Sequence, residues 1–224
     1  MAGDDLWVFG YGSLMWRPGF RHIEQVHARL RGYHRCFCIY STHHRGRPAR
    51  PGLVLGLDRG WSCEGIAYRV AAEHVAETVA YLRAREQLSG VYRETMVPVE
   101  LMTEPRRETP AMTYIVERAH PSYTGRLSLA RQAHLIRNAE GTSGPNLDYL
   151  VNTVRHLRAL GIRERDLERL LGLIAPHAAQ LSDGGLATPT ARGIIRAEPR
   201  SGNRAPRMKP DQRRRFLYRM RLGS

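Results

Sequence analysis

The hydrophobic pattern of this chain changes near its middle, and that change restricts the fold more than any other feature. The first half holds short apolar runs bounded by turn-forming or charged residues, at 6–9, 36–40, 53–57, 65–70, 95–101 and 113–116. Such runs are typical of β-strands. From residue 128 onward apolar residues recur every three or four positions, which predicts helices over 128–139, 147–158 and 167–174. Strands followed by helices favour an α+β fold with largely antiparallel pairing.

Three local features refine this prediction. One helix interrupts the strands from about residue 72 to 87, because Val75, Val79 and Leu82 share a helical face. Asp58-Arg59-Gly60 separates two apolar runs and predicts a hairpin turn. Pro98 has no main-chain donor, so we expect its strand at a sheet edge or a bulge.

Composition separates a folded body from a basic tail. Residues 1–180 carry the periodic patterns and are expected to form one domain. Residues 181–224 are rich in Gly, Pro, Ser and Arg without apolar periodicity, which predicts a poorly ordered extension. The chain has 35 basic and 21 acidic residues, a formal charge of +14, but Lys209 is its sole lysine. Nucleic-acid binders often mix both basic residue types, so we do not expect nucleic-acid binding as the main function.

The sequence gives no sign of a membrane protein or a metalloprotein. No apolar run approaches the roughly 18 residues of a transmembrane helix, and the acidic start is unlike a signal peptide. Three cysteines without a C-x-x-C pair fit reduced thiols, so we expect a cytoplasmic protein. The neighbouring His43 and His44 point opposite ways on an extended chain, and no third ligand has a familiar spacing. No metal or cofactor is expected.

The first candidate site is Gly10-Tyr11-Gly12-Ser13-Leu14, directly after the first predicted strand. Glycines let a ligand approach the main chain, and successive N–H groups in such a turn form a concavity for an anion. The segment is neither a P-loop nor G-x-G-x-x-G, since Met15 takes the last glycine's place. A plain turn between two strands would explain the same residues, so spacing alone leaves both interpretations open.

The second candidate is Glu86, four residues after Leu82 on the apolar face of the predicted helix. A carboxylate there would lie on the buried side of the last turn, where desolvation and the helix dipole raise its pKa. Such a group suits proton transfer. The alternative is a helix-end glutamate that pairs with Arg83 or reaches water. No comparable position is held by Glu73, Glu77 or Glu94.

Both candidates belong to a longer series of motifs. The series runs from Trp7-Val8-Phe9-Gly10-Tyr11-Gly12-Ser13-Leu14-Met15-Trp16 through His44-Arg45-Gly46, Pro51-Gly52, Gly65-Ile66-Ala67-Tyr68-Arg69, Arg85-Glu86, His120-Pro121-Ser122-Tyr123 and Ser143-Gly144-Pro145-Asn146 to Tyr149-Leu150. In this order it resembles the ChaC family of γ-glutamylcyclotransferases over about residues 6–175. The segment Arg85-Glu86-Gln87-Leu88-Ser89-Gly90 resembles the bacterial branch, since animal members have a Gly-Gly version.

This resemblance implies a compact, antiparallel-rich β-barrel with flanking helices, and the cofactor-independent cleavage of glutathione to 5-oxoproline and cysteinylglycine. It implies that Glu86 is the catalytic acid and base and that Tyr149 supplies a hydroxyl to the substrate pocket. The γ-glutamyl group would be held by the turn residues Gly10, Tyr11, Gly12, Ser13, Leu14 and Met15.

The chemistry of that reaction fits both candidates. The substrate amine attacks its own amide carbonyl, so the enzyme needs a proton acceptor and an oxyanion site rather than a nucleophile. Two alternatives share the same motifs: cyclotransfer on other γ-glutamyl peptides or amines, and a non-enzymatic regulator of cation transport. The intact turn and Glu86 count against the regulator.

Overall fold

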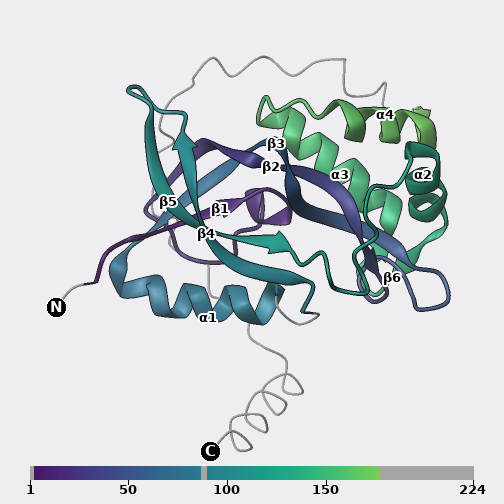
Figure 1. Ribbon diagram of the computed structural model, residues 1–224, viewed down its shortest axis with the longest axis horizontal. Helices are drawn as coiled ribbons and strands as arrows, with labels where there is room; N and C mark the ends of the chain where they lie inside the picture. The colour runs from purple at the N-terminus through teal and green to yellow at the C-terminus, as the bar shows by residue number, and fades with distance from the viewer. Residues whose placement is uncertain (1–2, 87–89, 177–224) are drawn as a thin grey trace, which may run out of the picture.

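A closed β-barrel forms the centre of the protein in the computed structural model, which describes residues 3–86 and 90–176 (Figure 1). Its strands are β1 (Leu6–Gly10), β2 (Glu24–Ser41), β3 (Gly52–Val70), β4 (Tyr92–Leu101) and β5 (Arg107–Val116). They follow the order β1-β3-β2-β4-β5 around the barrel. Neighbours are antiparallel except β1 and β5, which close the barrel in parallel where Val8 lies opposite Met112. The predicted antiparallel-rich barrel is therefore confirmed.

Alternating side chains of these strands fill the barrel. Phe9, Leu30, Leu57, Val99 and Leu101 are fully or almost fully buried in one cluster. The period of two residues places such side chains on one face of each strand. The burial of this apolar face drives barrel closure, which also removes unpaired sheet edges.

The predicted hairpin at Asp58-Arg59-Gly60 is wrong. Strand β3 runs unbroken through these residues, with Asp58 opposite His34. The β2–β3 connection lies instead at 42–51. Asp58 fits inside the barrel wall because its carboxylate accepts hydrogen bonds from the Arg118 guanidinium and the Tyr123 hydroxyl, each at 2.7 Å. Tertiary contacts thus outweigh the local turn preference of these residue types.

Pro98 lies where strand pairing changes. Strand β4 pairs with β2 only over Val99–Leu101, opposite Ala28–Leu30, and Pro98 is the next residue outside that stretch. On its other side Pro98 lies opposite Pro110 of β5. The missing donor of Pro98 therefore falls at a local edge, as predicted.

Helices cover the barrel on two sides (Figure 1). The short η2 (Ala72–His74) leads into α1 (Val75–Glu86), which lies across one side. The other side carries α2 (Leu129–Asn138), α3 (Asn146–Ala159) and α4 (Arg165–Ile174), with a small pair of strands, β6 (Glu140–Gly141) and β7 (Gly144–Pro145). The Ser128 side chain caps α2 by accepting a hydrogen bond from the Arg131 N–H at 3.2 Å, as predicted.

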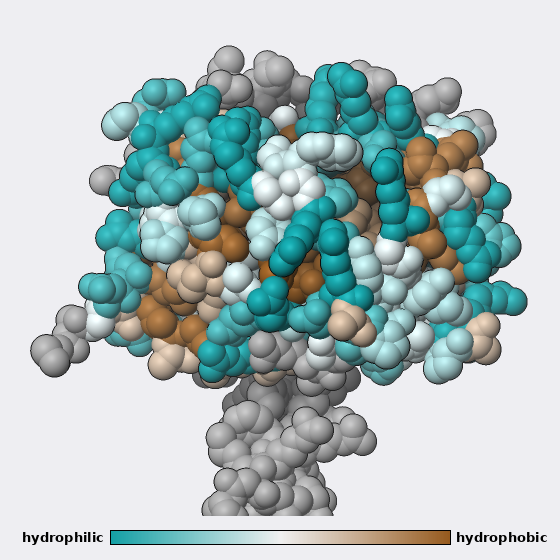
Figure 2. Space-filling view, viewed as in Figure 1, coloured by the Kyte–Doolittle hydropathy of each residue, from teal (hydrophilic) through white to brown (hydrophobic). Residues whose placement is uncertain are grey.

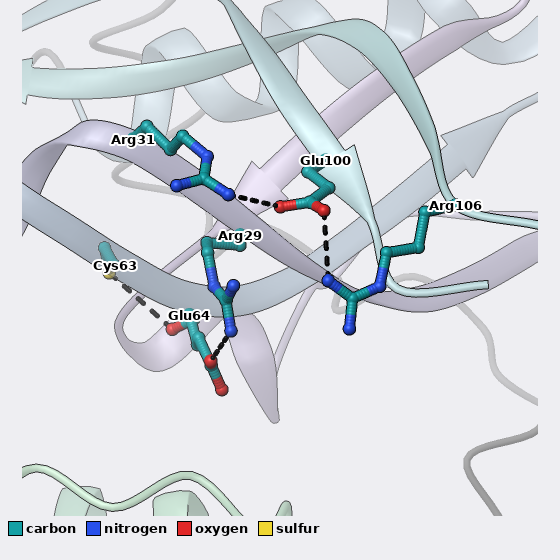
Figure 3. Close-up of polar contacts among 6 residues, drawn as sticks. All are labelled: Arg29, Arg31, Cys63, Glu64, Glu100 and Arg106. Atoms are coloured by element: carbon teal, nitrogen blue, oxygen red, sulfur yellow. Dashed lines mark hydrogen bonds and ion pairs between the residues drawn. The ribbon is translucent and has the colours of Figure 1, made fainter.

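Many arginines outside the barrel have carboxylate partners. Figure 3 shows Arg29 bonded to Glu64 at 2.7 Å, and Glu100 held between Arg31 and Arg106 at 3.3 and 3.2 Å. Figure 2 shows hydrophilic side chains over most of one face, with hydrophobic side chains in separate areas between them. Within 3–86 and 90–176, no helix has the length and apolar character needed to cross a bilayer. The predicted basic tail, 181–224, lies outside the described residues.

Candidate active site

The predicted anion-binding turn follows β1 and contains a short helical turn, η1 (Ser13–Met15). It begins without a side-chain cap, and its first internal hydrogen bond runs from the Met15 N–H to the Gly12 carbonyl at 2.9 Å. The leading N–H groups of a helical turn lack intrahelical partners. The side chains of Leu14 and Met15 are buried in the core. Only the main chain of these two residues is therefore available to a ligand.

The two glycines of the turn supply space rather than an unusual dihedral angle. Neither has a positive φ. A Cβ at Gly10 would lie 3.0 Å from the Leu14 Cβ, closer than packed carbons normally approach. A Cβ at Gly12 would lie 3.9 Å from the Tyr149 hydroxyl oxygen. Gly12 thus leaves the turn open towards Tyr149, which the sequence resemblance placed in the same pocket.

Buried groups fix the turn from behind. The Tyr68 hydroxyl donates to the Leu14 and Met15 carbonyls at 3.2 and 2.7 Å. The Arg35 side chain is 0% exposed, and its Nε donates to the Tyr11 carbonyl. Its other nitrogens donate to the Glu164 carboxylate and the Glu64 carbonyl. A buried cation with such partners holds the main chain of the turn in one position.

Glu86 is the last residue of α1, on the face predicted for it. Leu82 is fully buried one turn earlier, with Val75 and Val79 packed in the same cluster. The Glu86 side chain is 19% exposed, and its Oε1 lies 3.1 Å from the Arg85 Nε. Burial raises the pKa of Glu86, and the neighbouring Arg85 charge opposes part of that rise. The alternative partner Arg83 pairs with Glu94 instead, at 2.8 Å.

Arg85 joins this carboxylate to the turn. Its Nη2 donates to the Ser13 hydroxyl at 2.8 Å, and its Nη1 donates to the Arg17 carbonyl at 2.7 Å. One guanidinium thus contacts both predicted halves of the site. Because Ser13 and Glu86 are 73 positions apart in the sequence (86 − 13), only the fold brings them together.

Three tyrosines lie near enough to Glu86 to be affected by its charge. The Glu86 charge contributes to the raised pKa values of Tyr11, Tyr92 and Tyr149, although burial is the largest cause for each. The pKa of Tyr149 is raised to about 12. The Tyr92 hydroxyl donates to the Leu55 carbonyl at 2.7 Å. All three hydroxyls therefore stay protonated near neutral pH and are able to donate hydrogen bonds.

Sequence reasoning gave no role to Arg35, Tyr92 or Arg45. Arg35 carried one usable signal, because it precedes buried Phe37 by two residues and so continues an apolar strand face. Arg45 belongs to the motif His44-Arg45-Gly46, to which sequence reasoning gave no function. The Arg45 Cζ lies 5.4 Å from the centre of the Tyr149 ring. Tyr92 follows a turn, and nothing in its neighbours marks it.

A separate hollow lies away from these groups. It has a volume of about 510 Å³ and lies by Asp5, Trp7, Arg69 and Arg107, at the opposite end of β1 from Gly10. Arg69 pairs there with Asp5 at 2.7 Å, and Arg107 lies over the Trp7 ring. It holds none of the convergent groups found around Glu86.

A solved structure identifies the fold of this barrel. A gamma-glutamyl cyclotransferase specific to glutathione from yeast matches 78% of this chain and 97% of its own, with a TM-score of 0.70 and 24% identity. The barrel with its flanking helices is the γ-glutamylcyclotransferase fold.

The family follows from the sequence. The model of the ChaC-like protein family matches residues 6–176. The Escherichia coli K12 protein named glutathione-specific gamma-glutamylcyclotransferase is 33% identical over 184 residues, 82% of this chain and 79% of that protein. The human glutathione-specific gamma-glutamylcyclotransferase 1 is 34% identical over 171 residues, 75% of this chain and 77% of that protein. This chain belongs to the ChaC-like family.

Proposed function

We propose that this protein is a glutathione-specific γ-glutamylcyclotransferase, which converts glutathione to 5-oxoproline and cysteinylglycine without a cofactor. The observation that carries the proposal is the placement of Glu86, a desolvated carboxylate linked through Arg85 to the Gly-rich turn. The substrate comes from the names of the bacterial and animal relatives. Family membership alone would leave the catalytic residues unassigned.

Glu86 acts first as the base and then as the acid. Its carboxylate accepts a proton from the α-ammonium of the γ-glutamyl group, and the freed amine attacks the side-chain carbonyl carbon. A five-membered ring forms, and the carbonyl oxygen takes negative charge. Protonated Glu86 then gives its proton to the leaving nitrogen, and the oxyanion re-forms the carbonyl as the C–N bond breaks. Glu86 next takes the second proton from the ring nitrogen, which leaves the neutral ring amide of 5-oxoproline, and passes it to the amine of the departing cysteinylglycine. The raised pKa brings Glu86 nearer the operating pH, which favours both transfers.

The turn and the tyrosines hold the substrate in the folded conformer that reacts. The leading N–H groups of η1 bind the α-carboxylate or the developing oxyanion, because no side chain caps the start of η1. Tyr149 lies across from Gly12 and donates its hydroxyl to the substrate. Arg35 keeps the turn rigid from its buried side. Hydrogen-bond donors that are already held in place stabilise the transition state more than flexible donors do.

The proposed catalytic unit is residues 1–180, and the proposed location is the cytoplasm. Every residue given a role here lies within 10–149. Cys36, Cys38 and Cys63 are free thiols in the structure, which fits a reducing compartment.

Steady-state kinetics on defined substrates tests the proposal. Purified protein should form 5-oxoproline from glutathione with a higher kcat/KM than from γ-glutamyl-alanine, and oxidised glutathione should react poorly because its second half must also fit. Comparable kcat/KM values for glutathione and γ-glutamyl-alanine would overturn the glutathione specificity. A protein that forms no 5-oxoproline from any of the three would overturn the enzymatic function itself.

A further inference from the structure

Several motifs with no assigned role meet beside Tyr149. Residues 43–46 follow β2, and residues 141–145 precede α3, yet they are hydrogen bonded to each other. The Thr142 N–H donates to the His43 carbonyl at 2.8 Å, and the Ser143 N–H donates to the His44 carbonyl at 2.9 Å. The two segments therefore form one fixed unit at this side of the site.

Buried polar and glycine residues lock the main chain of this unit. Asn146 is 0% exposed, and its amide bonds both the N–H and the carbonyl of Leu53, at 2.6 and 2.8 Å. A Cβ at Gly52 would lie 2.0 Å from the Arg45 carbonyl oxygen, so only glycine fits there. A Cβ at Gly46 would lie 2.2 Å from the Gly52 nitrogen. So much local constraint positions Arg45 accurately.

The Arg45 guanidinium is held in place but not neutralised. Its Nη1 donates to the carbonyls of Ser143 and Pro145 at 2.6 and 3.2 Å. Within 3–86 and 90–176, no carboxylate pairs with it, and its Nε and Nη2 have no hydrogen-bond partner. Arg85 and Arg35 differ from it, because each already contacts a carboxylate. Arg45 therefore keeps a full charge and free donors suited to a planar anion.

The position of Arg45 fits the far end of a short peptide. The Tyr149 hydroxyl faces the turn at Gly12, and the Arg45 Cζ lies 5.4 Å from the centre of the same ring. Two extended residues span about 7 Å. A γ-glutamyl group in the turn, with its amide near Glu86, would thus bring a C-terminal carboxylate two residues later within reach of Arg45.

We propose that Arg45 is a specificity-determining residue. It binds the C-terminal carboxylate of the dipeptide that is attached to the γ-glutamyl group, and so selects peptides over γ-glutamyl amines. This inference rests on the proposed function. It adds the residue that binds the C-terminal end of the substrate, which lies away from the bond that is cleaved. The other carboxylate of the substrate, the α-carboxylate of the γ-glutamyl group, is bound by the turn that contains η1. A charge-assisted pair of this kind, partly shielded from water, is expected to change kcat/KM by about 10- to 100-fold.

The test compares glutathione with its C-terminal carboxamide, which has nearly the same shape but lacks the terminal charge. Wild-type protein should prefer glutathione by about 10- to 100-fold in kcat/KM. Arg45→Gln should lose that factor on glutathione and keep the wild-type rate on the amide. Arg47 is exposed and lies two residues after Arg45. Arg47→Gln removes an equal charge there, and it should leave both rates unchanged.

Three results would overturn the inference. One is a wild-type protein that cyclises both substrates equally well. Another is an Arg45→Gln variant that loses the same factor on both substrates, which would place Arg45 on their common γ-glutamyl part or in Tyr149 positioning. The last is an equal loss of preference in Arg47→Gln, which would indicate a long-range charge effect. If Arg45→Gln does not fold, Arg45→Lys keeps the charge without the planar fork and must retain a reduced preference. No 5-oxoproline from either substrate with wild-type protein would refute the proposed function itself.

Discussion

The substitution Glu86→Gln has the most clearly defined expected effects on catalysis and stability. Glutamine keeps the volume of the side chain and its contact with the Arg85 Nε, 3.1 Å from Oε1, but it cannot take up the substrate proton. General acid–base catalysis accounts for about 10²–10⁴ in rate. We therefore expect kcat to fall by at least that range while KM changes little, as measured by 5-oxoproline formation under saturating glutathione.

The same variant should not lose stability. Burial raises the pKa of folded Glu86, so the folded state holds this proton more tightly than the unfolded state. The stability of the fold therefore falls as the pH rises from the unfolded-state pKa through the folded-state pKa. At neutral pH the ionised carboxylate destabilises the folded state. Glu86→Gln removes that charge, so its urea midpoint at neutral pH should equal or exceed that of the wild type.

Glu94 provides the matched control. Glu94→Gln makes the same chemical change in a carboxylate that pairs with Arg83 at 2.8 Å, away from the turn. It should keep near wild-type kcat. If Glu86→Gln retains more than about a tenth of wild-type kcat, the expected loss is absent and the assignment of Glu86 is wrong. A loss of kcat in Glu94→Gln would then assign the proton transfers to Glu94, and Tyr149 would be the next residue to test.

Three further predictions concern the groups around the site. Arg85→Gln removes the charge that lowers the pKa of Glu86, so the acid limb of the kcat–pH profile should move to higher pH; an unmoved limb contradicts the coupling. Arg35→Met leaves Glu164 without its partner, and urea denaturation should show a loss of about 3–5 kcal/mol, towards the lower end because Glu164 is 27% exposed; a loss below about 1 kcal/mol contradicts the role of Arg35. Truncation after Leu181 should leave a folded protein with wild-type kcat, whereas an insoluble or inactive product would place the basic tail in the domain or an interface.

The elements with a strong period were predictable from the sequence. The seam of Val75, Val79 and Leu82 gives α1 and places Glu86 at its buried end, because a helical period fixes which residues share a face. Ser128 predicted the start of α2 for an equally local reason, since a serine side chain can satisfy a free helical N–H.

Features that depend on distant contacts were not predictable in this way. The false turn at Asp58 arose because its partners, Arg118 and Tyr123, are 60 and 65 residues away. The buried network of Arg35 likewise joins β2 to the turn and to Glu164, a contact that no local pattern records. Sequence reasoning found the two halves of the candidate site separately, and the fold supplied the link between them through Arg85.

The most direct test of the account is to identify the products of glutathione cleavage in ¹⁸O-labelled water. Attack by the substrate's own amine uses no water, so mass spectrometry should find equal amounts of 5-oxoproline and cysteinylglycine, neither carrying ¹⁸O. The Glu86→Gln variant should form both at a rate lower by at least the factor of about 10²–10⁴ expected for a lost base. Glutamate carrying ¹⁸O in place of 5-oxoproline would show hydrolysis by water and contradict the intramolecular mechanism.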